Sequence, residues 1–157
     1  MDASSFFQYD QDRPPADEVL FLAGASDEDW ERLAGAGRRQ RFRTGDVVMG
    51  QGERNRSLMI VLDGRLQTVV GSGRKQRRLS STPAGSVLGE IGFLDGSPRS
   101  ASVIAESDVE VLHIEFDDFL VLSRTHPDLT FRVLLDLSRI LAMRVRRLTE
   151  LVAGDRR

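Results

Sequence analysis

The spacing of short apolar runs in the middle of the chain limits its fold more than any other feature. Between Gln40 and Leu112, β-branched and apolar residues come in brief runs separated by Gly, Asp and Asn turn signals. Brief runs bounded by turn residues are typical of antiparallel strands. The pattern predicts an antiparallel sandwich or jelly roll. The strands are expected at residues 47–49, 58–62, 66–70, 102–104 and 109–114.

Helical signals lie on both sides of this region. Ser26 precedes three acidic residues, which predicts an N-cap and the acidic first turn of a short helix that ends near residues 35–37. Before it, residues 1–18 are polar and contain two adjacent prolines, so we expect a flexible tail. His126 precedes Pro127 and predicts a junction between helices, because a residue before proline is pushed out of the helical region.

The longest periodic segment runs from Asp128 to Val152 and predicts a helix with two apolar faces. One stripe contains Val133, Leu137 and Ile140 and is expected to cover the domain. A seam of residues 134, 141 and 148, completed by Val145 and Val152, is expected to meet a partner, most simply the same helix of a second subunit. A single broad core face in a monomer remains the alternative.

Composition excludes several classes of site. The chain has 157 residues, enough for one ordinary domain at residues 19–152 with short tails at 1–18 and 153–157. It has no cysteine, which excludes disulfides, iron–sulfur clusters and thiolate zinc sites, and its two histidines, His113 and His126, lie too far apart to suggest a metal site. No apolar run approaches the roughly 20 residues that span a bilayer, and the N-terminus lacks a signal-peptide pattern. We expect a cytoplasmic protein without a cofactor or metal and without a membrane partner.

Residues 89–103 carry the most specific chemistry. Arg99 offers a planar fork of donors to two phosphate oxygens, and ionised Glu90 can accept a proton from a ribose hydroxyl. A short helical turn is expected to begin near Gly89 and to aim N–H groups at a phosphate. The turn at residues 95–98 would carry Arg99 back toward that helix. An Arg and a Glu at this spacing are also compatible with a solvated surface pair.

This stretch, Gly-Glu-Ile-Gly-Phe-Leu-Asp-Gly-Ser-Pro-Arg-Ser-Ala-Ser-Val, resembles the phosphate-binding cassette of cyclic-nucleotide-binding domains. These domains occur in the catabolite activator family, in cyclic-nucleotide-dependent kinase subunits and in cyclic-nucleotide-gated channels. Turn pairs at residues 45–46, 52–53 and 63–64 recur at similar positions in the family, so the resemblance covers about residues 21–151. It implies a mainly β fold with flanking α-helices: an antiparallel β-roll (a double-stranded β-helix, or jelly roll) with an N-terminal helix and a long C-terminal helix.

The resemblance also implies the residues of a ligand site. Leu79 and Ser80 would lie on the strand that lines the purine pocket, although core packing explains Leu79 equally well. Thr149 would place one hydroxyl over the purine, whereas Leu148 stands where a second hydroxyl lies in relatives. Ser100 after the arginine favours cAMP over cGMP. The full set of expected ligand contacts is Gly89, Glu90, Ile91, Gly92, Arg99, Ser100, Ala101, Leu79, Ser80 and Thr149.

The resemblance implies a stand-alone regulatory domain that signals to a protein effector by repositioning its C-terminal helix. The chain stops at residues 153–157 with no helix-turn-helix, so we expect no direct DNA binding. An enzyme of the cupin type would need a histidine cluster that this chain lacks. A structural module with a degenerate pocket is the stronger alternative. The basic run 74–78 indicates a solvated hairpin tip or, alternatively, a docking patch for an acidic partner.

Overall fold

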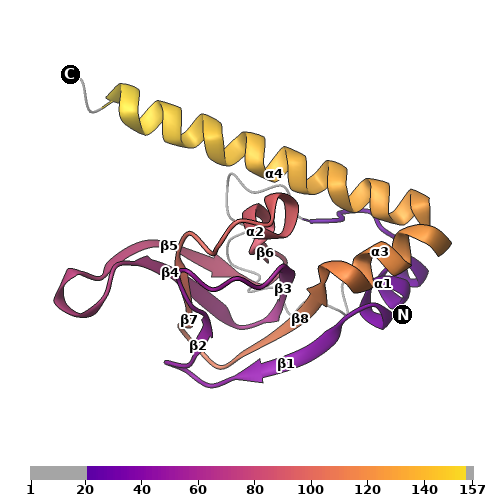
Figure 1. The fold of residues 1–157 in the computed structure, drawn as a ribbon, viewed down its shortest axis with the longest axis horizontal. Helices are drawn as coiled ribbons and strands as arrows, with labels where there is room; N and C mark the ends of the chain where they lie inside the picture. The colour runs from indigo at the N-terminus through magenta and orange to yellow at the C-terminus, as the bar shows by residue number, and fades with distance from the viewer. Residues whose placement is uncertain (1–20, 155–157) are drawn as a thin grey trace.

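A computed structural model describes residues 21–154 of the protein. Two antiparallel four-stranded sheets form a β-roll, with strand orders β1-β8-β3-β6 and β2-β7-β4-β5 (Figure 1). This architecture confirms the predicted antiparallel roll. The strands are β1 (Arg38–Phe42), β2 (Val47–Met49), β3 (Ser57–Asp63), β4 (Arg65–Val70), β5 (Arg77–Pro83), β6 (Val87–Leu88), β7 (Ser102–Ala105) and β8 (Val109–Glu115).

Alternating side chains of the central strands divide the core into two clusters, as expected for strands with two buried faces. On β8, Val109 and Val111 join the cluster inside the roll, whereas Leu112 and Ile114 join the cluster under the helices. The strand expected at residues 109–114 therefore has one face in each cluster. The predicted hairpin tip is also confirmed, because a single turn of 3-10 helix, η2 (Gly73–Lys75), joins β4 to β5 and residues 71–80 are exposed.

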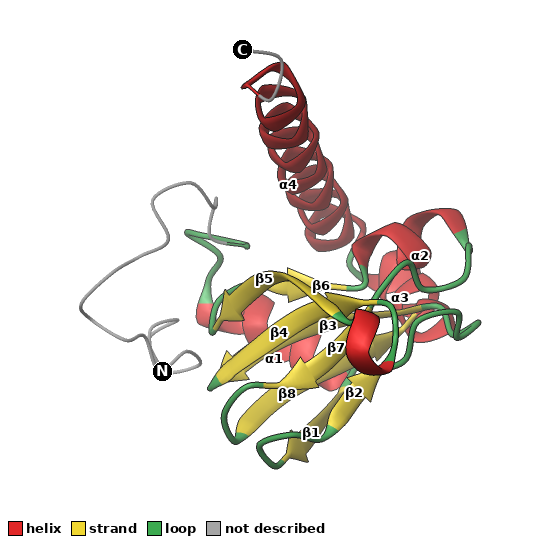
Figure 2. Cartoon of the chain, turned by 90° about the vertical axis from the view of Figure 1, so that its left-hand side faces the viewer, coloured by secondary structure: helices red, strands yellow, loops and turns green. Residues whose placement is uncertain are grey.

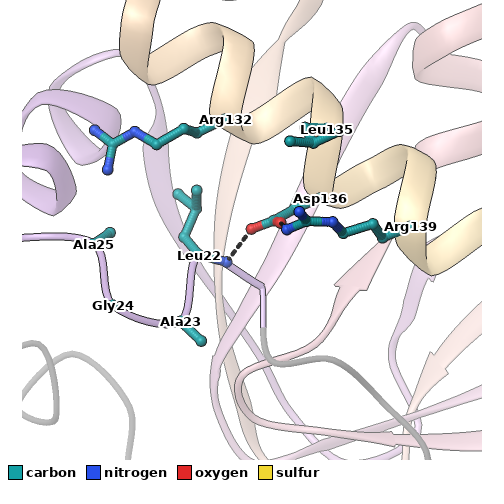
Figure 3. Close-up of a pocket in the computed structure, with 8 residues that line it drawn as sticks. All are labelled: Leu22, Ala23, Gly24, Ala25, Arg132, Leu135, Asp136 and Arg139. Atoms are coloured by element: carbon teal, nitrogen blue, oxygen red, sulfur yellow. Dashed lines mark hydrogen bonds and ion pairs between the residues drawn. The ribbon is translucent and has the colours of Figure 1, made fainter.

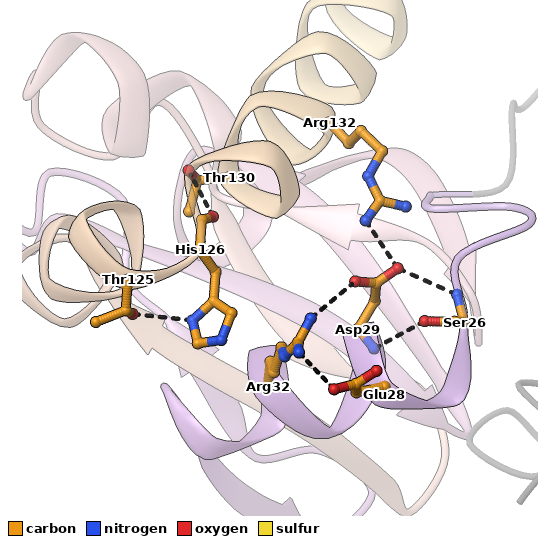
Figure 4. Close-up of polar contacts among 8 residues, drawn as sticks. All are labelled: Ser26, Glu28, Asp29, Arg32, Thr125, His126, Thr130 and Arg132. Carbon is orange, nitrogen blue, oxygen red and sulfur yellow. Dashed lines mark hydrogen bonds and ion pairs between the residues drawn. The ribbon is translucent and has the colours of Figure 1, made fainter.

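Helix α1 (Asp27–Gly35) begins as predicted, with Ser26 as its N-cap. The Ser26 hydroxyl accepts a hydrogen bond from Asp29 N at 3.1 Å, and the Asp29 carboxylate accepts one from Ser26 N at 3.2 Å. Asp29 also accepts a hydrogen bond from Arg132 of helix α4 at 2.7 Å (Figure 4). Burial tends to raise the pKa of Asp29, but the hydrogen bonds from Arg132 and Ser26 lower it below its usual value. The first turn of α1 is thereby tied to α4.

Two helices follow the last strand: α3 (Phe116–Thr125) and α4 (Pro127–Gly154), joined at His126. His126 has φ −134° and ψ 64°, which confirms the predicted junction. The sequence predicted this junction but gave no bounds for α3, the helix before it. The expected C-terminal tail begins later than predicted, because residues 153 and 154 continue α4. The expected tail at residues 1–18 and the last three residues of the chain lie outside the described residues.

Helix α4 changes its surroundings along its length. Val133 and Leu137 are fully buried, whereas Val145, Leu148 and Val152 are about 60% exposed. Figure 2 shows the C-terminal part of α4 projecting away from the two sheets. The two predicted apolar faces are therefore present, one packed on the domain and one open. Among residues 21–154, no helix combines the length and the apolar character that a membrane crossing requires.

Candidate functional site

The short helix α2 (Glu90–Asp95) lies at the centre of the candidate site and begins where the sequence predicted it. Gly89 precedes it with φ +78°, a left-handed conformation that favours glycine. A Cβ at Gly89 would lie 2.7 Å from Arg99 Nη1 and 2.9 Å from the Ser57 carbonyl oxygen. Glycine is therefore needed here both for the backbone conformation and for the close approach of Arg99.

Arg99 is buried beneath the start of α2, with 4% of its surface exposed. Its Nη1 donates to Gly89 O at 2.8 Å, and its Nη2 donates to Ser57 O at 2.7 Å and to Ser57 Oγ at 2.8 Å. Its Nε donates to Asn55 Oδ1 at 2.7 Å. These contacts confirm that the turn at residues 95–98 returns Arg99 to the beginning of α2.

The charge of Arg99 is balanced by carboxylates that do not contact it directly. Burial lowers the pKa of the Arg99 guanidinium, and the carboxylates of Glu53, Glu90 and Glu115 oppose that effect. An arginine keeps its proton in proteins, so the group stays a cation. The beginning of α2 thus has a fixed positive charge whose orientation is set by protein acceptors.

Glu90 is also buried, with 4% of its surface exposed. Its Oε1 accepts a short hydrogen bond from Arg144 Nη1 of α4, and Arg144 Nη2 donates to Val87 O at 3.2 Å. The carboxylate that was predicted to hold a ribose is therefore ion-paired to the C-terminal helix. Among residues 21–154, the contacts of this carboxylate use Oε1, which leaves Oε2 as an acceptor.

The residues expected around a purine are open to solvent. Leu79 is 57% exposed, and Ser80 and Thr149 are exposed as well. The alternative that Leu79 belongs to the core is wrong. The Thr149 hydroxyl donates to Val145 O at 3.0 Å within α4. The structure therefore gathers the expected sugar-phosphate contacts Glu90 and Arg99 around the start of α2, whereas the expected base contacts remain exposed.

The remaining predicted residues surround the start of α2 at different depths. Gly92 is buried in the helix, and Ile91 beside it is 46% exposed. Ser100 is exposed and Ala101 is half-buried directly after Arg99. A small residue at position 92 is needed, because a Cβ there would lie 3.0 Å from Ser97 O and 3.1 Å from Arg99 Nη1.

Sequence analysis missed three residues of this site. Asn55 and Ser57 hold Arg99, but they lie more than forty positions before it and carry no local signal. Arg144 did carry a signal: it continues the buried stripe of Val133, Leu137 and Ile140 by one further helical step. A cation at a position that faces the domain indicates a buried acceptor, which here is Glu90.

A separate pocket of about 200 Å³ lies between residues 22–25 and α4 (Figure 3). Asp136 accepts a hydrogen bond from Leu22 N at 2.9 Å and pairs with Arg139 at 3.1 Å. The other arginine of the pocket, Arg132, pairs with Asp29. Both cations are thus neutralised, and none of the predicted ligand contacts lines this pocket. Nowhere in residues 21–154 do three or more acidic or histidine side chains gather as a metal site would require.

The model of the cyclic nucleotide-binding domain family matches residues 39–126, which is more than half of the chain. The protein therefore belongs to the cyclic nucleotide-binding domain family. The matched region contains all eight strands except the first residue of β1, together with α2 and Arg99. It ends at the junction before α4.

Individual relatives agree with this assignment. The chain is similar to the crystal structure of the catabolite activator protein from Thermus thermophilus, with a TM-score of 0.74 and 26% identity over 86% of this chain and 62% of that one. It is 31% identical to the cyclic AMP receptor protein of Thermus thermophilus, over 69% of this chain and 49% of the relative. It is 32% identical to lysophospholipase nte1 of Neosartorya fischeri, over 68% of this chain and 7% of the relative. The chain thus spans about half or less of the length of these two curated relatives.

Proposed function

We propose that this protein is a regulatory receptor domain for a cyclic nucleotide, with cAMP preferred over cGMP. One observation carries the proposal: a buried guanidinium and a buried carboxylate lie together at the start of α2, each held by protein partners. A cyclic nucleotide offers one anionic phosphate and one free ribose hydroxyl. The pair Arg99 and Glu90 therefore matches the ligand in charge and in hydrogen-bonding type.

The hydrogen-bonding capacity that remains at the site supports this assignment. Arg99 has five N–H donors, and its four side-chain hydrogen bonds within residues 21–154 leave one N–H of Nη1 for a phosphate oxygen. Glu90 Oε2 can accept a hydrogen bond from the ribose hydroxyl while Oε1 stays bonded to Arg144. The exposed hydroxyl of Ser100 lies next in the chain and offers a further donor.

Two features support cAMP as the ligand. The residue after Arg99 is a serine rather than a threonine. A relative with 31% identity is a cyclic AMP receptor protein. We therefore assign cAMP as the preferred ligand and cGMP as the weaker one.

The output of the receptor is a movement of α4, transmitted by Arg144. A ligand shifts a conformational equilibrium only if it binds one state more tightly than the other. Arg144 joins the ribose-binding carboxylate to α4, so a ligand that changes the position of Glu90 changes the position that α4 prefers. We propose a protein effector as the receiver of this movement.

The open seam of α4 supports a homodimer. The seam follows a heptad spacing. Four of its five members, Leu134, Val145, Leu148 and Val152, are 38% to 62% exposed, and Leu141 is half-buried. We expect Leu148→Glu to convert a dimer into a monomer, because it places a charge in the seam, whereas Arg146→Glu outside the seam leaves the dimer intact. Light scattering after size-exclusion chromatography measures both variants. A monomeric wild-type protein would contradict the dimer and favour the single-face alternative.

Calorimetric titration of the protein with cAMP, cGMP and 5′-AMP tests the proposed function. We expect saturable binding of cAMP, weaker binding of cGMP and none of 5′-AMP, which is not cyclic. A thermal-shift assay supports the titration, because ligand at one hundred times its Kd stabilises a protein by about 2.7 kcal/mol. If neither cyclic nucleotide produces heat or a shift in Tm, the protein is a structural module with a degenerate pocket.

A further inference from the structure

We propose that Arg56 is a positioning residue that locks helix α2 to helix α3, so that a movement of α2 on nucleotide binding is carried to α3 and on to α4. The signalling part of this inference rests on the proposed function. The mechanical link between α2 and α3 does not, and it can be tested without a ligand.

Arg56 contacts α2 at the end opposite Arg99. Its Nε donates to Phe93 O at 2.8 Å and its Nη2 donates to Leu94 O at 2.9 Å. Phe93 and Leu94 are among the last residues of α2, where helix carbonyls lack partners within the helix and attract a cation. One guanidinium therefore fixes the end of α2 through two separate carbonyls.

Arg56 contacts α3 through both its side chain and its backbone. Its guanidinium carbon lies 3.3 Å from the ring centroid of Phe116, the first residue of α3. Its carbonyl oxygen accepts a hydrogen bond from Phe116 N at 2.9 Å. The same residue thus holds the last turn of α2 and the first turn of α3 in one arrangement.

The neighbours of Arg56 extend the link to the ligand site. Asn55 and Ser57, on either side of Arg56, are the residues that hold Arg99. Three consecutive residues therefore grip α2 at both ends, one end through Arg99 and the other through Arg56. A displacement of Arg99 by a bound phosphate would pull on the same short segment that is fixed to α3.

Apolar packing also joins α2 to α3, but with less directional control. The Phe93 ring packs edge-on against Phe116 at 5.3 Å and against Phe119 at 5.2 Å between ring centroids. Such packing keeps the two helices together, but the preferred geometry of an aromatic pair is broader than that of the hydrogen bonds that Arg56 donates. Removing the Arg56 guanidinium should leave the fold intact and loosen the geometry between α2 and α3.

The experiment compares Arg56→Gln with Arg54→Gln, a change of the same charge at an exposed residue two positions earlier. Amide hydrogen exchange is first measured without nucleotide. We expect Arg56→Gln to raise the exchange rates of Gly96 N–H, at the end of α2, and of Phe116 N–H by about tenfold or more. Arg54→Gln should change neither rate. If Arg56→Gln loosens only one of these two amides, or neither, Arg56 does not link the helices.

The second measurement adds saturating cAMP and follows exchange along α4, with affinity determined by calorimetry. We expect Arg56→Gln to bind cAMP within about threefold of wild type and to show a smaller cAMP-dependent change in α4 protection than wild type and Arg54→Gln, because the direct link from Glu90 to α4 through Arg144 remains. A normal α4 response in nucleotide-bound Arg56→Gln would overturn the signalling role. If wild type binds no cAMP, the proposed function fails, and the nucleotide-free measurement alone decides the link.

Arg56→Lys provides a test if Arg56→Gln does not fold. Lysine keeps the charge but lacks the planar fork that reaches two carbonyls while stacking on a ring. We expect the faster exchange at both amides in Arg56→Lys as well. Wild-type exchange in this variant would overturn the inference, because charge alone would then suffice.

Discussion

The two ends of the candidate site contrast in burial. At the cassette end, Arg99 and Glu90 are each 4% exposed and hydrogen-bonded to protein partners. At the base end, Leu79 is 57% exposed and the Thr149 hydroxyl is bonded only to its own helix among the described contacts. The proposed sugar-phosphate contacts are built into the fold, whereas the proposed base contacts are not.

This contrast follows from the cost of burying charge. A buried guanidinium or carboxylate must have partners whether or not a ligand is present, so the chain supplies them itself. An exposed leucine or threonine needs no protein partner, so it can remain in solvent until a ligand or a second surface covers it. In the proposed receptor, the buried pair Arg99 and Glu90 would anchor the nucleotide, and Arg144 would connect this anchor to α4 because it reaches from α4 to Glu90.

Removing the cassette cation should have the largest effect. We expect Arg99→Gln to weaken cAMP binding by at least about 100-fold, because it removes a charge-assisted contact to the phosphate. It should also destabilise the protein by about 1–3 kcal/mol, because it removes the guanidinium donor from the buried carbonyl and hydroxyl oxygens of Ser57. Calorimetry and urea unfolding measure the two effects.

Ser57→Ala is the matched control for this change. It removes one acceptor of Arg99 but keeps the cation. We expect a loss of stability of about 1 kcal/mol and only a few-fold loss of affinity. If Arg99→Gln binds cAMP as tightly as the wild type does, the cassette end of the site does not anchor the nucleotide.

Breaking the pair between Glu90 and Arg144 should have the next largest effect. We expect Glu90→Gln to weaken cAMP binding by about tenfold, because a neutral amide is a weaker acceptor. Arg144→Gln should cost about 1–3 kcal/mol of unfolding free energy, because it leaves a buried carboxylate without its cation. The double variant should recover part of that loss.

A double-mutant cycle in urea measures the coupling between these two residues. A coupling free energy below about 0.5 kcal/mol would mean that the two side chains act independently. In that case Arg144 would not connect α4 to the cassette, and the two ends of the site would be unlinked.

Changes at the base end should be small. We expect Thr149→Ala to change stability by less than about 0.5 kcal/mol and cAMP affinity by less than about threefold, because an exposed side chain has few contacts to lose. Calorimetry with cAMP and cGMP measures the affinity of Thr149→Ala. The same measurement on Ser80→Ala tests the loss of a second exposed hydroxyl, on β5. A tenfold loss of cAMP affinity in Thr149→Ala would show that α4 closes over the base. Such a loss would contradict the proposed difference between the cassette end and the base end.

The smallest expected effect concerns His113, whose side chain is 13% exposed and whose buried Nδ1 has no hydrogen-bond partner among residues 21–154. Burial lowers the pKa of His113; Glu115 opposes this shift, whereas Arg38 and Arg99 add to it. The unfolded chain binds the proton more readily, with a pKa of about 6.5. The stability that this group contributes is therefore complete above about pH 6.5 and is lost as the pH falls toward the lower pKa of the folded state.

Urea unfolding of wild type and His113→Gln between pH 7.5 and 5 checks this sign. We expect the wild type to lose more stability than the variant over this range. The difference bears on the cassette because Arg99 is one of the charges that disfavours the imidazolium. Parallel pH profiles would show that His113 has the same pKa in both states.

Local sequence patterns determined much of the fold. The runs at residues 58–62 and 109–114 became the central strands β3 and β8, because short apolar runs and the turn residues that bound them act within a few positions. Ser26 determined the start of α1 in the same way. The edge strand β1 escaped prediction because its sequence, Arg-Arg-Gln-Arg-Phe, has no apolar run, and it pairs on one side only with β8.

The candidate site also combines features set by local sequence with features set by tertiary packing. By itself, the sequence determined that a glycine-started turn of helix would be followed by a returning arginine, because residues 89–99 form one local unit. Only the tertiary structure decided which groups hold that unit. Glu90 pairs with Arg144 across 54 positions, and Asn55 meets Arg99 across 44. Such partners are selected by how strands and helices pack, and no pattern within a few residues specifies them.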